Sequence, residues 1–239
     1  MIQFLSRKEA LKKNSILASY VIDMQKKFYA PDLFEPGENW LDEEERLVEM
    51  NEEECAIRNK PILVKFESTI DSLDDLPELK RFTDECILST REHDKVHVEI
   101  MAGDLEKLNK ILEWDGMLFI PEFPYSWLEF INSKDEDDRK VADWFLSKGV
   151  DKNFNGAIYA SDEDLEAFMQ LLVHFIVRRV DSFPVCRFAG VNSSAIGSVC
   201  KYGNIHYLFY KNGEYTNFEN AIKETSLVEI PFGACEYKF

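Results

Sequence analysis

The chain has few of the residues that mark catalytic and metal centres. Its 239 residues include only four histidines, and no pair of them has the H-E-x-x-H or H-x-H spacing of a metal site. The glycine-rich dinucleotide fingerprint, the P-loop lysine and the G-x-S-x-G motif are also missing. The sequence therefore assigns no catalytic residue, no metal ligand and no cofactor. The histidines are His93, His97, His174 and His206, of which His97 is expected on the exposed side of a strand with Glu99.

Cysteine is scarce as well, and its spacing excludes the usual cysteine-rich sites. The five cysteines are an odd number and contain no CxxC pair, so they indicate neither a disulfide framework nor a zinc ribbon. We expect reduced thiols that are mostly buried. A thiol nucleophile needs a nearby base, and the only candidates close in sequence are Cys186 or Cys200 with His206. The other cysteines are Cys55, Cys86 and Cys235.

Basic residues are outnumbered, with 28 Lys and Arg against 45 Asp and Glu and a formal net charge of −17. This excess repels nucleic-acid phosphates and anionic lipid, and it favours basic partners. No stretch approaches the roughly 18 uncharged apolar residues of a membrane span, and the first residues lack the apolar region of a signal peptide. We therefore expect a cytoplasmic protein that binds neither nucleic acid directly nor a membrane.

The apolar content, in contrast, is ample for a folded protein. Hydrophobic residues make up 45% of the chain and aromatic residues 13%. Between Arg7 and Tyr29, apolar residues recur at helical spacing and leave lysines for the solvent side, which predicts an amphipathic helix. Its basic face either complements the acidic stretch that follows or binds an anionic surface.

The acidic residues are concentrated in one stretch. Residues 31–60 hold eleven acidic residues against three basic ones, a net charge of −8. Pro31, Pro36 and Gly37 predict a loop, after which Asp42 is placed to cap an acidic helix. Like charges at this density repel, so either a basic partner offsets the cost or the face is solvated beside the N-terminal lysines. The candidate partner-binding residues are Glu43, Glu44, Glu45, Glu52, Glu53 and Glu54, with a second run at Asp135, Glu136, Asp137 and Asp138.

The middle of the chain alternates between strand and helix patterns. Strands are predicted over 62–66, 95–101 and 117–120, and helices over 77–92 and 104–114 and before Gly149. Because strand, helix and strand follow one another across 95–120, we expect a parallel pair there. The segment 120–133 has two prolines and four aromatic residues, which predicts a turn and a short helix packed on the core.

The last third opens with a strand over 156–160 and the strongest helix of the chain, 162–181. Ser161 and Asp164 form a capping-box pattern, and apolar residues surround most of the helix, which places it at the centre of a domain. Strands are predicted over 184–189 and 195–200, with 190–198 containing the turn between them. Asn212-Gly213 predicts a hairpin between aromatic runs, followed by a short helix over 218–224 and an edge strand over 227–232.

Together these patterns predict an α+β protein. We expect a mixed sheet with helices in the N-terminal two thirds, and an antiparallel β-rich C-terminal part around helix 162–181. The predicted organisation is an acidic region with the basic N-terminal helix over 1–150 and a second region over 151–239, or one continuous domain.

The charge pattern favours a protein that binds another protein. We expect a partner with a basic surface, either a toxin or a nucleic-acid-binding enzyme. This chain would inhibit that partner, as an immunity protein, an antitoxin or a phage-type inhibitor does. Its carboxylates would imitate the phosphates of a nucleic acid. The alternatives are an enzyme with a site in the C-terminal β-rich half, and a non-inhibitory adaptor or assembly subunit. If the interface is apolar, Phe123, Tyr125 and Trp127 are its candidates.

Overall fold

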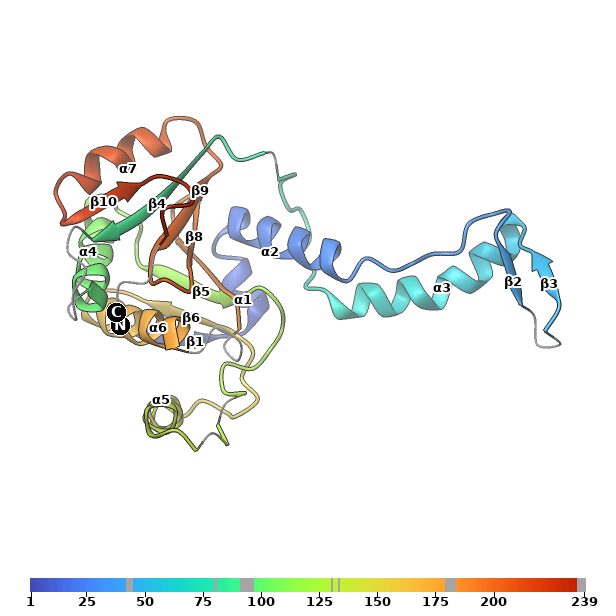
Figure 1. The fold of residues 1–239 in the computed structure, drawn as a ribbon, viewed down its shortest axis with the longest axis horizontal. Coiled ribbons are helices and arrows are strands. Elements are labelled where there is room, and N and C mark those ends of the chain that lie inside the picture. Colours follow the sequence, from blue (N-terminus) through green and yellow to red (C-terminus); the bar gives the residue numbers. More distant parts are fainter. Residues whose placement is uncertain are drawn as a thin grey trace.

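The body of the protein is built on one eight-stranded sheet (Figure 1). The computed structural model describes residues 1–41, 45–79, 81–90, 97–129, 131–132, 134–178 and 184–235. Every strand pairing among these residues is antiparallel. The α+β class is confirmed. In spatial order the strands are β1 (Ile2–Leu5), β6 (Ala157–Ala160), β5 (Met117–Pro121), β7 (Cys186–Gly190), β8 (Ala195–Val199), β9 (Ile205–Phe209), β4 (Asp84–Thr90) and β10 (Leu227–Ile230).

Two N-terminal helices cover one face of the sheet. Ser6 caps α1 (Arg7–Leu11) in a capping box with Glu9, and Asn14 caps α2 (Ser15–Phe28). The single helix expected over 7–29 is therefore two helices, because Asn14 adopts an extended backbone and ends the first run. Leucines and valines of both helices pack against the β5, β7 and β8 side chains Leu118, Ile120, Ala189 and Ile196.

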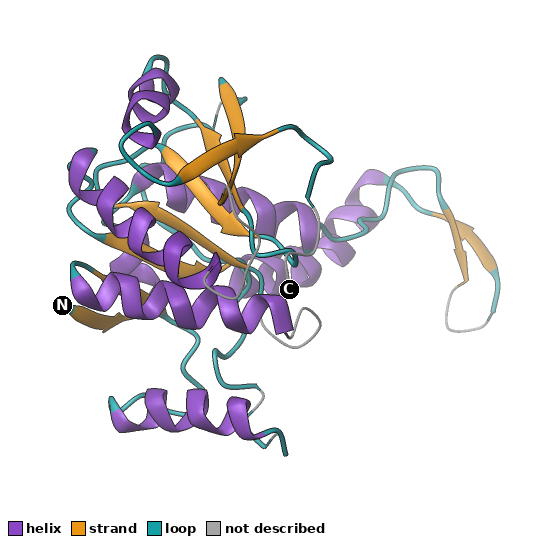
Figure 2. Ribbon diagram, turned by 60° about the vertical axis from the view of Figure 1, so that its left-hand side comes forward, coloured by secondary structure: helices purple, strands orange, loops and turns teal. Residues whose placement is uncertain are grey.

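Helices α4 (His97–Ile111), α6 (Glu163–Arg178) and α7 (Glu214–Ile222) cover the opposite face. Figure 2 shows helices (purple) on both sides of the strands (orange). The buried Phe168 of α6 packs its ring 4.8 Å from that of Phe119 on β5. Helix α5 (Glu136–Ser147) adds Phe145, which lies against Trp127 in the same core. The predicted central role of the helix at 162–181 is confirmed over its described part, and it begins after Asp162, whose φ of 54° is not helical.

Three helices connect pairs of strands that run in the same direction but are never neighbours. Helix α6 joins β6 to β7, which flank β5, and α7 joins β9 to β10, which flank β4. Helix α4 joins β4 to β5 across β9, β8 and β7. The parallel pair expected across 95–120 was wrong, because its first predicted strand is part of α4 from His97 onward, and β4, the strand before this helix, is separated from β5 by β9, β8 and β7.

Several segments adopt a secondary structure different from the one predicted from the sequence. The alternating residues predicted as a strand over 95–101 begin α4 at His97, and the predicted helix over 77–92 contains strand β4 at its end. Strand β4 is sandwiched between β9 and β10, and this pairing outweighs the helical spacing of its apolar residues. The run 62–66, predicted as a strand, is helical.

The hairpin predicted at Asn212-Gly213 is also wrong. Gly213 has a φ of 80° and stands at the N-terminus of α7, which begins four residues earlier than the expected helix over 218–224. The same left-handed glycine can turn the chain into a strand or into a helix, and burial of Phe218 selects the helix. The final strand β10 is at the edge of the sheet, as predicted.

One segment leaves the body, and we call residues 30–70 the arm. It contains the two-stranded hairpin of β2 (Asn39–Leu41) and β3 (Leu47–Glu49), and it returns through α3 (Glu52–Thr69) (Figure 1). Asp42, Glu43 and Glu44 lie outside the described residues, so the predicted cap at Asp42 is not addressed, and the acidic helix begins at Glu52. Among the described helices, none has both the length and the apolar composition for crossing a membrane.

The core position of α6 gives a stability prediction. Leu172 is completely buried, so Leu172→Ala should lower the free energy of unfolding by about 2 to 5 kcal/mol. Chemical denaturation measures this change. The matched control is Leu146→Ala on α5, whose side chain is exposed, and there we expect a change of about 0.5 kcal/mol or less. A Leu172→Ala midpoint equal to that of the wild type would place α6 outside the core.

Candidate partner-binding arm

A buried network fixes the base of the arm to the body. Asp71, just after α3, accepts hydrogen bonds from Arg7 Nε at 2.8 and 3.1 Å and forms an ion pair with the same guanidinium group. Gln25 of α2 donates to Asp71 Oδ2 at 2.8 Å and accepts from the Asp71 amide at 2.7 Å. Arg7 Nη1 and Gln25 Nε2 also donate to the backbone carbonyls of Pro121 and Glu122. The end of α3 is thus held by α1, α2 and the end of β5.

The outgoing and returning segments of the arm are bonded to each other. The Asn59 side chain of α3 accepts from the Phe34 amide and donates to the Phe34 carbonyl, both at 2.9 Å. Gly37 and Glu38 pair with the backbone of Met50, which is buried. The Arg58 guanidinium lies over the Trp40 ring, 3.5 Å from its centroid. The arm therefore has a small core of its own and is an ordered projection.

Helix α3 exposes an apolar face. Asn51 and Glu54 form a capping box at its start, so Glu54 has a structural role at the helix N-terminus. Cys55 is buried on the inner side, whereas Ile57 and Val64, which share the outer face with Pro61, are 66% and 59% exposed. At the tip, Leu41 and Leu47 are 55% and 70% exposed. Exposed apolar side chains gathered on one projection are a feature of interaction surfaces.

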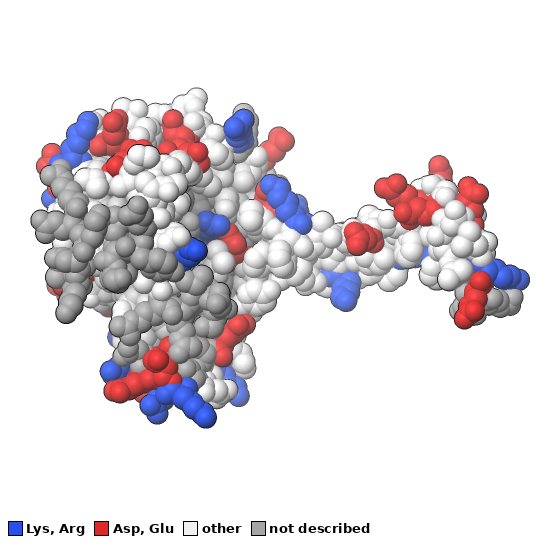
Figure 3. All heavy atoms as spheres, in the orientation of Figure 1, with Lys and Arg blue, Asp and Glu red and all other residues white. Residues whose placement is uncertain are grey.

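Carboxylates border this apolar face. Of the predicted residues, Glu45, Glu52 and Glu53 are exposed on the arm, while Glu43 and Glu44 lie outside the described residues. Glu35, Glu38 and Glu49 add exposed carboxylates at the hairpin. Figure 3 shows acidic side chains gathered at the far end of the arm. The structure thus combines a dense acidic surface, which the sequence predicted, with exposed apolar residues that it did not predict, of which Val64 was assigned to a strand over 62–66.

The second acidic run is on a different part of the molecule. Asp135 precedes α5, and its side chain accepts from the Asp138 amide at 3.3 Å. Glu136 is exposed and forms an i,i+4 ion pair with Lys140 at 3.3 Å. Asp138 is only 3% exposed, so its carboxylate is not on the surface, and the Asp137 side chain lies outside the described residues. This run belongs to α5, away from the arm (Figure 1).

The aromatic segment after β5 is mostly internal. Trp127 is completely buried and donates to the Gly156 carbonyl at 2.9 Å. Phe123 packs against Phe28 and Tyr29 where the arm begins, with ring centroids 4.5 and 5.5 Å apart. Tyr125 is exposed. Trp127 therefore cannot serve as the surface residue considered for an apolar interface, because the fold uses it in the core.

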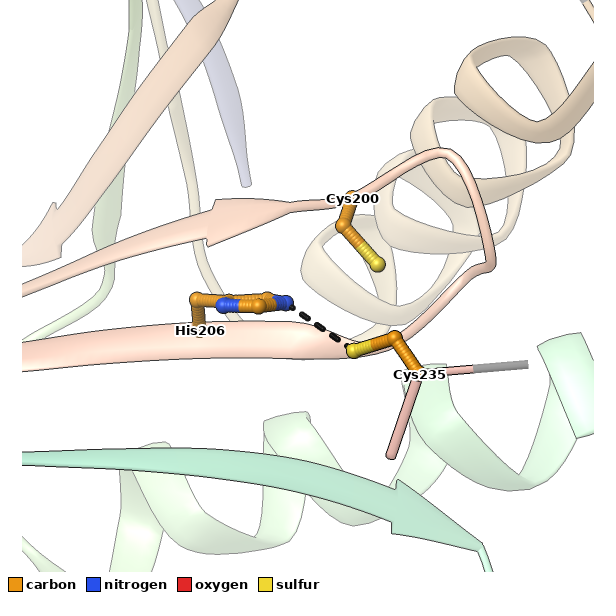
Figure 4. A group of neighbouring side chains, drawn as sticks. All are labelled: Cys200, His206 and Cys235. Atoms are coloured by element: carbon orange, nitrogen blue, oxygen red, sulfur yellow. Dashed lines mark hydrogen bonds between the residues drawn. The ribbon is translucent and has the colours of Figure 1, made fainter. Parts of the chain in front are cut away.

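A cluster of sulfur and nitrogen ligands lies at the end of β8 and β9. Cys200, His206 and Cys235 each offer one ligand atom, and these atoms lie within 4.8 Å of one another (Figure 4). The Cys235 sulfur is 3.4 Å from His206 Nε2. The sequence offered Cys186 or Cys200 as the partner of His206, and the structure brings Cys200 there; Cys235, 29 residues beyond the histidine, was not predicted and reaches it through the fold.

Burial sets the protonation of this cluster. It lowers the pKa of His206, and the nearby Arg187 charge acts in the same direction, so the imidazole is neutral at neutral pH. Burial also raises the pKa of the Cys200 thiol.

His97 is completely buried, contrary to the exposed strand position expected. It lies in α4, where its ring nitrogens contact Thr90 Oγ1 at 2.6 Å and the Gly203 carbonyl at 3.3 Å.

Within the segment 190–198, the turn at 191–194 lines a surface cleft of about 710 Å³. Ser193 and Ser194 are bonded to the Glu214 carboxylate of α7, with 2.7 Å between Ser193 Oγ and Glu214 Oε1. Asn14 donates to the Gly190 and Ser193 carbonyls, both at 2.8 Å. The polar groups that line the cleft bond one another, which is the arrangement of a braced turn between β7 and β8.

Comparison of this chain with protein-family models, with curated proteins and with solved structures gave no match.

The bond between Asn59 and Phe34 gives a test of the arm's order. Asn59→Ala removes both side-chain hydrogen bonds to the outgoing segment, so the Phe34 amide should exchange its hydrogen at least about tenfold faster, as loss of about 1.4 kcal/mol of local stability implies. Hydrogen exchange resolved by residue measures this. The global free energy of unfolding should stay within about 0.5 kcal/mol.

The matched control is Lys60→Ala, the exposed neighbour on α3, for which we expect an unchanged exchange rate at Phe34. Equal rates in the wild type and in Asn59→Ala would show that the two segments are not held together by this side chain.

Proposed function

We propose that this protein binds a partner with a basic surface through the arm, and that the bound arm inhibits or neutralises that partner. The observation that supports this proposal is the coincidence, on one ordered projection, of an exposed apolar face and a border of exposed carboxylates. Apolar contact supplies affinity when it is removed from water, and the carboxylates select a positively charged partner and orient it.

The form of the arm favours insertion into a concave site. Helix α3 has 18 residues, a length of about 27 Å at the usual rise per residue. An ordered projection enters a cleft with little loss of conformational entropy, since its backbone is already fixed by the Asn59 bonds and the Asp71 network. The binding groove of an enzyme that acts on nucleic acid combines these features, a concave shape and a basic lining, and carboxylates can occupy the positions of phosphates there.

A second copy of the chain is a poor partner for the arm. Each copy carries a formal net charge of −17, so two acidic arms repel each other at low ionic strength. A basic surface on another protein would instead attract the acidic arm.

The alternative of an enzyme in the C-terminal half has the cleft at 190–198 as its best location. Its two serines already bond Glu214, which leaves the acidic arm as the better-supported functional feature.

Substitution of the apolar face should abolish partner capture without unfolding the body. In the variant Ile57→Asp with Val64→Asp, both side chains are exposed, so folding is retained while the outer face of α3 becomes charged. Affinity purification from the native cell with the wild-type chain and with this variant, followed by quantitative identification, measures the difference. We expect the captured amount of the basic proteins that the wild type retains to fall at least about tenfold with the variant. A loss of this size is expected because binding would bury an unpaired charge.

Charge reversal separates a specific surface from general attraction. Glu45→Lys, Glu52→Lys and Glu53→Lys on the arm should also lose the partner, whereas Glu136→Lys, Glu219→Lys and Glu224→Lys, exposed on the body, change the net charge equally and should retain it. Equal retention by both triple variants, or a dimer of the wild-type chain that the Ile57 and Val64 substitutions dissociate, would contradict the proposal.

The rate of association gives an independent test. Raising the ionic strength from about 0.05 to 0.5 M shortens the screening length from roughly 14 to 4 Å, so the on-rate for the captured partner should fall at least about tenfold. Stopped-flow or surface-based kinetics measures it. An on-rate that does not change across this range would show that the carboxylates do not steer binding and that the interface is apolar alone.

A further inference from the structure

The cluster of Cys200, His206 and Cys235 has the composition of a soft metal site. Two sulfurs and one imidazole nitrogen are the ligands that zinc prefers, and two thiolates neutralise the charge of a divalent cation. The three residues are half-buried, so the site is partly shielded and still open to solvent. This cluster plays no part in the arm and is independent of the function proposed above.

The backbone brings the three residues together from distant parts of the sequence. Cys200 follows β8 and pairs with Asn204 across a tight turn, with 2.9 Å between the Cys200 nitrogen and the Asn204 oxygen. His206 alternates on β9 with the buried Ile205 and Tyr207, so it points to the same face as Cys200. After β10 the chain reverses at a turn in which the Ala234 amide bonds the Pro231 carbonyl, and this turn delivers Cys235 onto that face.

The distances suit tetrahedral zinc. With bond lengths of about 2.3 Å to sulfur and about 2.05 Å to nitrogen, a tetrahedral ion sets ligands about 3.6 Å apart for S and N and about 3.8 Å apart for two sulfurs. The Cys235 sulfur and His206 Nε2 are 3.4 Å apart, and no pair among the three ligand atoms exceeds 4.8 Å. A small rotation of side chains is enough to close the site.

We propose that Cys200, His206 and Cys235 bind one Zn²⁺ ion, with a water molecule as the fourth ligand, and that the ion holds the segment after β10 against the ends of β8 and β9. Binding replaces the proton of each thiol with a Zn–S bond, so two protons leave for each zinc bound. Three protein ligands with one open position is the arrangement in which zinc retains a water molecule.

The test uses the full chain, reduced and freed of metal by a chelator, and titrated with Co²⁺ as a spectroscopic substitute for zinc. We expect one equivalent to bind, with the visible bands of tetrahedral cobalt and a thiolate-to-cobalt charge-transfer band, and Zn²⁺ to displace it. Cys200→Ser, Cys235→Ser and His206→Ala should each weaken binding at least about 100-fold, since changes even to residues behind the ligands cost up to that factor.

The control is Cys55→Ser, on the arm, which should leave the stoichiometry and spectrum unchanged. Zinc should also slow amide hydrogen exchange over 232–235 in the wild type but not in Cys235→Ser, a readout that does not depend on cobalt. Absence of stoichiometric binding, binding that persists in Cys235→Ser, or a Cys200–Cys235 disulfide whose reduced form takes up no metal would each overturn the proposal.

Discussion

The position of the arm on the body depends on the ion pair between Arg7 and Asp71. Arg7 is buried in the body, and Asp71, which is half-buried, directly follows the arm. Taking both charges out of water is costly, and the geometry compensates because Gln25 and backbone carbonyls satisfy the remaining polar atoms. Loss of one partner would leave the other charge buried and unpaired, at about 3 to 5 kcal/mol. The pair joins the first helix of the chain to the point where the arm returns, so it fixes the direction from which the arm projects.

This anchoring explains why an 18-residue helix with a single buried residue can be ordered. Most helices are stabilised by packing one apolar face on a core, whereas α3, among the described residues, is bonded to the outgoing segment of its own arm. The Asn59 bonds, the Arg58 stack on Trp40 and the Asn51 cap supply local order in place of a core. The outer apolar face is then left exposed, and the neighbouring carboxylates make that face incompatible with another acidic surface.

The middle of the sheet forms the core of the body, and the part towards β4 and β10 holds the cluster of Cys200, His206 and Cys235. Its middle is covered on both faces, by α1 and α2 on one side and by α4, α6 and α7 on the other. Towards β4 and β10 the chain itself crosses the face after the last strand, and this brings Cys235 to Cys200 and His206. The proposed partner surface and the proposed metal site therefore lie in different parts of the molecule and can be altered independently.

The elements whose signals are local could be predicted from the amino-acid sequence. The central helix at 163–178, strands β5 and β6, the edge strand β10 and the dense acidic stretch follow from periodicity, capping residues and composition. The remaining elements depend on contacts between distant segments. The β4 residues are a strand because β9 and β10 pair with them, 62–66 continue α3 in place of the predicted strand, and Cys235 meets His206 because the chain reverses after β10. Each of these outcomes depends on partners distant in sequence, and a local pattern carries no information about which partner a segment will find.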